Sequence, residues 1–129
     1  MIKVKDRMSR NLNTIPVSSS ALDAAKTLTE KKFSSIFIEE GGKIIGVATD
    51  TDLIRNVMAV GKNPGATPVS DIMTKEVHTI DLNKALTEAG DLMDKAYVRH
   101  LGVTENGKII GVISVRDLIH PMYTDGEGW

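Results

Sequence analysis

The sequence predicts an α/β (α+β) fold of two β-α-β-β-α repeats packed around a pseudo-two-fold axis. Two observations carry this prediction: a pentapeptide that occurs twice, and a common order of apolar runs and turn signals around each occurrence. Residues 43–47 and 108–112 both read Lys-Ile-Ile-Gly-Val, and these runs start 65 residues apart, at positions 43 and 108. Self-similarity at a fixed period is typical of repeat proteins. A unit of about 60 residues buries too small a share of its surface to be stable alone, so we expect each copy to depend on the other for its stability.

Further segments repeat at the same offset. The matches are Asp52-Leu53-Ile54 with Asp117-Leu118-Ile119, Thr14-Ile15 with Thr79-Ile80, and Val4, Asp6 and Met8 with Val69, Asp71 and Met73. Ala21-Leu22 matches Ala85-Leu86 at an offset of 64, which implies that one residue is gained and regained between the anchors. We therefore predict repeat 1 at residues 1–62, a turn-rich linker at 63–68, repeat 2 at 69–122 and a C-terminal tail at 123–129.

The elements of each repeat follow from local patterns. We expect a short strand near residues 12–15 and 77–80, then a helix, and then an apolar strand at 36–38 and 101–103. Turns at Gly41-Gly42 and Asn106-Gly107 lead into returning strands at 43–48 and 108–113, since Asn-Gly is a strong hairpin signal. A second helix starts near Asp50 with Gly61 as its C-terminal stop, and Pro121 shortens its counterpart in repeat 2.

Helical spacing predicts which side chains face the core. For the first helix of each repeat these are Ala21, Ala25 and Leu28, and then Ala85, Ala89, Leu92, Met93 and Ala96. For the second helix of repeat 1 they are Leu53, Ile54, Val57 and Met58.

Composition argues against some classes of protein and excludes others. The 129 residues carry 16 Lys and Arg against 17 Asp and Glu, for a formal net charge of −1, whereas binders of nucleic acid or anionic membranes usually carry a basic excess. The absence of cysteine excludes disulfides, thiolate metal sites and cysteine nucleophiles. No signal peptide or apolar membrane span occurs, so we expect a soluble cytoplasmic protein.

The pattern Gly-x-x-Thr/Ser-x-x-Asp occurs once in each repeat, where a strand ends and a helix begins. It comprises Gly46, Thr49 and Asp52 in repeat 1, and Gly111, Ser114 and Asp117 in repeat 2. The glycine would let a ligand or another backbone approach the strand. A carboxylate there suits a vicinal diol, and a hydroxyl beside helix-terminal amides suits phosphate. The same spacing also fits a capping box, and a capping Asp can still present an oxygen to a ligand.

Arg99 and His100 open the middle strand of repeat 2. Cations at the mouth of a sheet suit phosphate, with Arg as a planar donor of several hydrogen bonds. A solvated strand end is the alternative interpretation. Repeat 1 has Ser34-Ser35 at this place and no cation, so any phosphate preference should be stronger in repeat 2.

Enzyme chemistry lacks support in the sequence. His78, His100 and His120 show no metal-ligand spacing, and neither a Gly-x-Ser-x-Gly elbow nor a P-loop occurs. We therefore expect no catalytic residues, no metal and no required cofactor.

These motifs make each repeat resemble the cystathionine β-synthase (CBS) domain, and the whole chain resembles a tandem pair, or Bateman module. The resemblance covers residues 4–122 and is most specific at 46–53 and 111–118 and at the openings 4–8 and 69–73. It implies a regulatory module that binds AMP, ADP, ATP or S-adenosylmethionine in clefts between the repeats.

The resemblance also implies roles for residues of both repeats. Asp52 and Asp117 would hold ribose hydroxyls, and Thr49 and Ser114 would assist at ribose or phosphate. Thr14-Ile15 and Thr79-Ile80 would wall the adenine. Arg99 and His100 would reach phosphate oxygens, with Ser35 at the corresponding place in repeat 1.

The expected partners are an adenine nucleotide, a second copy in a homodimer and a separate regulated protein. The alternatives are a dimerisation or docking module without a ligand, and a nucleic-acid-binding regulator.

Overall fold

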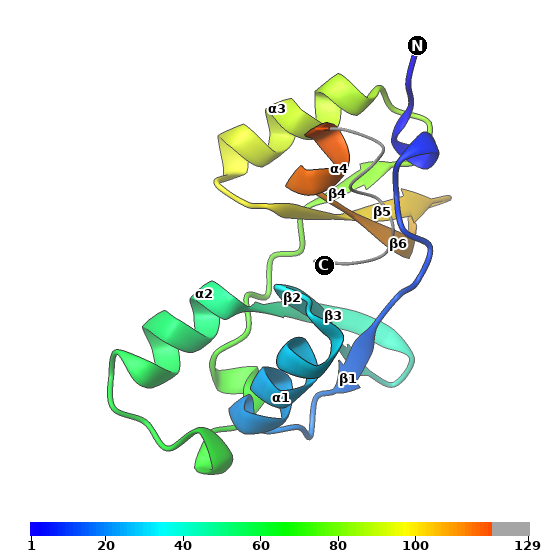
Figure 1. Ribbon diagram of the computed structural model, residues 1–129. Coiled ribbons are helices and arrows are strands. Elements are labelled where there is room, and N and C mark those ends of the chain that lie inside the picture. The colour runs from blue at the N-terminus through cyan, green and yellow to red at the C-terminus, as the bar shows by residue number, and fades with distance from the viewer. Residues whose placement is uncertain (120–129) are drawn as a thin grey trace. The chain divides into compact units, whose positions relative to one another are not determined.

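A computed structural model describes residues 1–119 of the chain, which form two compact units (Figure 1). We call residues 13–77 the first-copy unit, and residues 1–12 with 78–119 the second-copy unit. The prediction that Pro121 shortens the last helix, and the predicted tail at 123–129, lie outside the described residues, as does His120.

The first-copy unit is a three-stranded sheet with helices on one face (Figure 1). Its elements are β1 (Thr14–Pro16), α1 (Ala21–Lys31), β2 (Ser35–Glu40), β3 (Lys43–Thr49) and α2 (Asp50–Leu53), which continues as a π-helical turn over Ile54–Met58. Strand β2 lies in the middle of the sheet, parallel to β1 and antiparallel to β3.

The second-copy unit has the same topology. Its elements are β4 (Thr79–Asp81), α3 (Leu86–Ala96), β5 (His100–Glu105), β6 (Lys108–Ser114) and α4 (Val115–Ile119). Strand β5 is parallel to β4 and antiparallel to β6. The β-α-β-β-α order is therefore confirmed twice. Both predicted hairpin turns are confirmed too, with positive φ at Gly41, Gly42, Asn106 and Gly107.

The two copies align at 65 residues throughout, so the predicted local offset of 64 is wrong. The N-caps of α1 and α3 are Ser20 and Ala85, and their C-caps are Lys32 and Tyr97. The repeated Ala-Leu pair is misleading, because Ala21 begins a helix whereas Ala85 is the cap before one. Ala85 accordingly does not belong to the core face of its helix.

The segment that opens each repeat packs inside the unit of the other repeat. The 3₁₀ turn at Val4–Asp6 is followed by Ser9, whose backbone exchanges two hydrogen bonds with Val112 of β6. In the first-copy unit, Thr74 follows the turn at Val69–Asp71 and exchanges two backbone bonds with Val47 of β3. Each opening segment therefore adds a short antiparallel bridge to the outer strand of the sheet.

These bridges explain the glycine of the repeated motif. A Cβ on Gly111 would overlap the carbonyl oxygen of Ser9, and a Cβ on Gly46 would lie 2.7 Å from Met73 Sδ and 3.0 Å from the carbonyl oxygen of Thr74. The close approach is thus made by another backbone, which was one of the two alternatives the sequence left open.

The cores are aliphatic and lie between each sheet and its helices. In the first-copy unit Ile36, Ile38 and Ala48 of the sheet meet Leu28 and Val57. On α1 the buried alanines are Ala21 and Ala24, whereas Ala25, predicted to face the core, is only half-buried.

Two residues of the second helix do not face the core as predicted. Val57 is 4% exposed and Leu53 packs against the core, but Ile54 is 58% exposed and Met58 is 78% exposed. Each lies one position after an inward residue, and successive residues of a helix point in different directions around its axis.

Candidate functional site

In the first copy, Thr49 and Asp52 join the end of β3 to the start of α2. The Thr49 hydroxyl accepts a hydrogen bond from the Asp52 amide at 3.0 Å, and the Asp52 carboxylate accepts one from the Thr49 amide at 3.0 Å. This reciprocal pair is a capping box, so the capping interpretation is confirmed here. Both side chains remain half-buried, which leaves them partly accessible from solvent.

The Asp52 carboxylate has a second partner that the sequence did not indicate. The hydroxyl of Thr74 lies 3.1 Å from Asp52 Oδ1 and 3.3 Å from Oδ2. The backbone bridge to Val47 brings Thr74 there, because Val47 lies on β3, the strand that leads directly into the helix that carries Asp52. The carboxylate therefore joins the opening segment of repeat 2 to the end of repeat 1.

In the second copy, Ser114 and Asp117 form a related but deeper arrangement. The Ser114 amide donates to Asp117 Oδ2 at 2.8 Å, and the Ser114 hydroxyl lies 3.4 Å from the same oxygen. Ser114 is 4% exposed and Asp117 is 2% exposed. Burial raises the pKa of Asp117 from 3.8 to about 6, against the opposing effect of the Ser114 hydrogen bonds and nearby Arg116 and Arg7.

Arg7 is a second residue that sequence analysis missed. Its guanidinium donates to the backbone carbonyl of Asp117 at 3.3 Å, across 110 positions of sequence. No local pattern could indicate this bond, because it depends on how the N-terminal segment packs against repeat 2. Ile72, 65 positions later, is instead a buried core residue of the first-copy unit.

The predicted residues of the middle strands lie at the same end of each sheet as the strand-to-helix junction. His100 is paired with Ser114 across β5 and β6, and Ser35 is paired with Thr49 across β2 and β3. Arg99, immediately before β5, is exposed, and its carbonyl accepts a hydrogen bond from the Val115 amide that begins α4. Arg99 and His100 therefore lie beside the start of helix α4.

Thr79 and Ile80 lie one strand further from the carboxylate. Thr79 of β4 is opposite Gly102 of β5, so two inter-strand spacings, about 10 Å, separate its strand from β6. Thr14 of β1 is likewise opposite Phe37, its hydroxyl lies 3.4 Å from a carboxylate oxygen of Glu39, and Ile15 is buried in the core. The structure thus brings the junction hydroxyl and carboxylate close to the first residues of the middle strand. The Thr-Ile pairs lie on the opposite edge strand of each sheet, β1 or β4.

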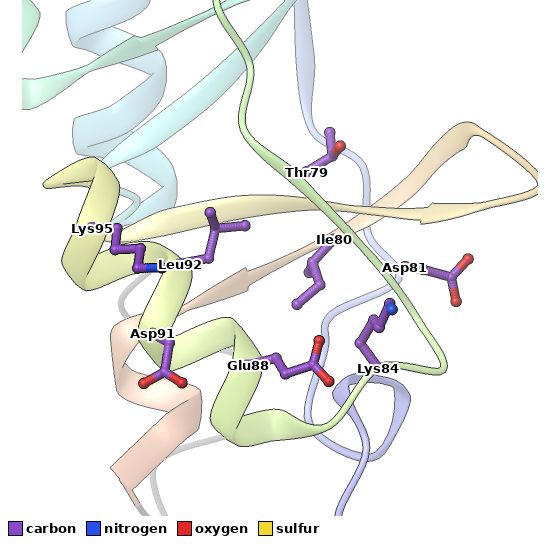
Figure 2. Close-up of a pocket in the computed structure, with 8 residues that line it drawn as sticks. All are labelled: Thr79, Ile80, Asp81, Lys84, Glu88, Asp91, Leu92 and Lys95. Carbon is purple, nitrogen blue, oxygen red and sulfur yellow. The ribbon is translucent and has the colours of Figure 1, made fainter.

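Thr79 and Ile80 line a pocket of their own. It has a volume of about 400 Å³ and lies between β4 and helix α3, with charged side chains that include Lys84, Glu88 and Asp91 (Figure 2). Ser114 and Asp117 do not line this pocket. The predicted adenine wall of repeat 2 therefore lines this pocket without the predicted ribose acceptor.

The described residues offer neither a metal site nor a membrane span. Among residues 1–119, no group of three or more His, Cys, Asp or Glu side chains is arranged to hold a metal ion. Within the same range, no helix combines the length and the apolar character that crossing a membrane would need.

The fold and the repeated strand-to-helix junction define a tandem repeat protein with one candidate polar site in each copy. The family model of the CBS domain matches residues 4–59 and again residues 69–123, so the chain belongs to the CBS domain family and carries two copies. The resemblance stated from the motifs is therefore confirmed.

Known relatives match this chain over nearly its whole length. The CBS domain-containing protein YhcV of Bacillus subtilis is 28% identical over 99% of this chain and 91% of its own length. A solved structure of a protein with CBS domains from Burkholderia ambifaria is 32% identical, has a TM-score of 0.84, and is matched over 90% of this chain and 85% of its own. The CBS domain pair of protein MJ0100 was solved in complex with 5′-methylthioadenosine and S-adenosyl-L-methionine. It is 24% identical, with a TM-score of 0.80 and coverage of 90% and 95%, which shows a common fold.

Proposed function

We propose that this chain is a non-catalytic regulatory module that binds an adenosine-containing ligand and passes the binding event to a separate protein. AMP, ADP, ATP and S-adenosylmethionine are the candidate ligands. The observation that carries the proposal is the paired junction itself. In each copy a carboxylate and a hydroxyl lie together where the last strand meets a helix, at Thr49 with Asp52 and at Ser114 with Asp117.

The chemistry of the junction supports a ribose. A carboxylate can accept hydrogen bonds from both hydroxyls of a vicinal diol, as acidic residues do in dinucleotide-binding folds. Arg99 and His100, at the same edge of the sheet in repeat 2, would supply donors to phosphate. The ligands bound to MJ0100 are of the same chemical class, and we extend that class to this chain as part of the proposal.

The test is a titration of the purified chain with AMP, ADP, ATP, S-adenosylmethionine and 5′-methylthioadenosine, followed by calorimetry and by thermal unfolding. A ligand at about 100 times its Kd should stabilise the protein by about 2.7 kcal/mol. The double variant Asp52→Asn with Asp117→Asn keeps a capping oxygen at each junction and should lose the ligand effect. Asp94→Asn, on the exposed surface of α3, is the matched control. Unchanged melting with all five ligands would refute the proposal.

The role of repeat 2 in phosphate binding has its own readout. Arg99→Gln removes the positive charge and should weaken AMP and ATP more than adenosine, because adenosine has no phosphate. Equal losses of affinity for AMP and adenosine would mean that Arg99 stabilises the start of β5 and does not bind phosphate.

A homodimer is the second part of the proposal. Ile54, Met58 and Val60 are exposed by 58%, 78% and 60% on the second helix of repeat 1 and just beyond it. An adjoining groove of about 320 Å³ is lined by Ala21, Val57 and Pro64, among others. Clustered apolar surface of this kind is typical of protein–protein contacts. Met58→Glu should shift the mass in light scattering from dimer to monomer, while Asn56→Glu, on another face of the same helix, should leave the dimer intact.

A further inference from the structure

The first-copy carboxylate already accepts a hydrogen bond from a hydroxyl of the protein itself. Thr74 has a single hydroxyl proton, and its oxygen lies within 3.1 Å of Asp52 Oδ1 and 3.3 Å of Oδ2, so it bridges the two carboxylate oxygens. The Thr49 amide takes a further lone pair of Oδ2 at 3.0 Å. A carboxylate has about four lone-pair sites in all, so Thr74 competes for those that a diol would use.

The backbone keeps this hydroxyl in place. The Thr74 amide donates to the Val47 carbonyl at 2.8 Å, and the Val47 amide donates to the Thr74 carbonyl at 2.9 Å. Because these bonds involve only main-chain atoms, the side chain can rotate away from Asp52 while the bridge persists. Thr74 is exposed, so a ligand could displace its hydroxyl without opening a buried core.

Among residues 1–119, the second copy shows no such arrangement. Ser9 stands 65 positions before Thr74 and makes the same backbone bridge, to Val112 of β6. Its hydroxyl oxygen instead accepts a hydrogen bond from the Asn11 amide at 3.2 Å. Within the described residues, the side-chain hydrogen bonds to Asp117 come from Ser114 and fall on Oδ2.

We propose that Thr74 is a specificity-determining residue that weakens ribose binding at the first-copy site. A ribose diol reaches Asp52 only by displacing the Thr74 hydroxyl, and within residues 1–119 no equivalent hydroxyl from an opening segment is bonded to Asp117. This inference deepens the proposed function and rests on it.

The test isolates the first-copy site in an Asp117→Asn background, in which the Asn side chain still offers an oxygen to the Ser114 amide. Adenosine and 2′-deoxyadenosine are titrated by calorimetry into three proteins: the background alone, the background with Thr74→Val and the background with Thr74→Ser. Valine keeps the β-branched shape of threonine and removes the hydroxyl, whereas serine keeps the hydroxyl.

Thr74→Val should tighten adenosine binding about three- to tenfold, the size expected when one competing, solvent-exposed hydrogen bond is removed. It should also raise the ratio of adenosine to 2′-deoxyadenosine affinity, because the freed oxygen recognises the second hydroxyl. Thr74→Ser should retain the weaker affinity of the background. Circular dichroism and melting temperature confirm that the three proteins are equally folded.

The outcomes separate the two proposals. If the native chain binds adenosine but Thr74→Val leaves the affinity or the hydroxyl ratio of the first-copy site unchanged, the role of Thr74 is overturned and the proposed function stands. If the native chain and every variant bind neither nucleoside nor nucleotide, both are overturned. Tighter binding that serine reverses supports both.

Discussion

The same carboxylate has different surroundings in the two copies. Asp52 is half-buried and bonded to the hydroxyl of Thr74, while Asp117 is 2% exposed, bonded to Ser114 through one oxygen and adjacent to the N-terminal segment through Arg7. Both sit in the same motif, on the same strand-to-helix junction, 65 residues apart. The difference arises from the segment that packs beside each junction, which belongs to the other repeat in sequence. Equivalent motifs can therefore have unequal accessibility and unequal competition for a ligand.

The largest expected effect concerns the glycine that admits the opening segments. A Cβ at Gly111 would meet the Ser9 carbonyl, which is backbone and cannot rotate away, whereas at Gly46 the nearest atom is the flexible Met73 sulfur. We expect Gly111→Ala to lower the free energy of unfolding by about 3 kcal/mol and Gly46→Ala by about 1 kcal/mol, because overpacking costs a few kcal/mol when neighbours cannot yield. Chemical denaturation measures both. Equal losses would mean that the two bridges are equally adaptable.

The next effect is the pH dependence that Asp117 gives the second-copy unit. Its pKa is raised by burial to about 6, so between about pH 4 and pH 6 the folded protein retains a proton that the unfolded chain has released. Stability therefore falls as the pH rises through that window, by about 3 kcal/mol in total. Melting curves from pH 4 to pH 7.5 should show this loss, and Asp117→Asn should flatten it. A loss that persists in the Asn variant would have to arise from another group.

The smallest effect is at the helix that follows the first strand of each copy. Helix α1 has a capping box formed by Ser20 and Asp23, whereas α3 has Ala85 at its N-cap and no side-chain cap. Ala85→Ser would place serine three residues before Glu88 and should stabilise the chain by about 1 kcal/mol. Ser20→Ala should destabilise it by a similar amount. Thermal unfolding of the two variants tests whether capping is worth the same in both copies.

Much of the fold could be predicted from local patterns. The hairpin turns follow from Gly-Gly and Asn-Gly, and the cap at Thr49 from its spacing to Asp52, because these features involve neighbours a few residues apart. The error at Ala85 has a related cause: two letters matched locally, while the position of the helix start is set by packing. The outward side chains of Ile54 and Met58 were missed because apolar character alone does not say which face of a helix is covered.

The sequence by itself determined that the chain is a double CBS repeat, the order of its elements, and the residue types at each strand-to-helix junction. The order of elements follows from the periodicity of apolar residues and from turn signals. The repeat and its family resemblance follow from short motifs with fixed spacings. Only the tertiary structure decided which segment lies against each junction, and so gave Asp52 the Thr74 hydroxyl and Asp117 the Arg7 guanidinium at its carbonyl. These partners are 22 and 110 residues away in sequence. Contacts at such separations depend on the packing of whole segments, which no local pattern encodes.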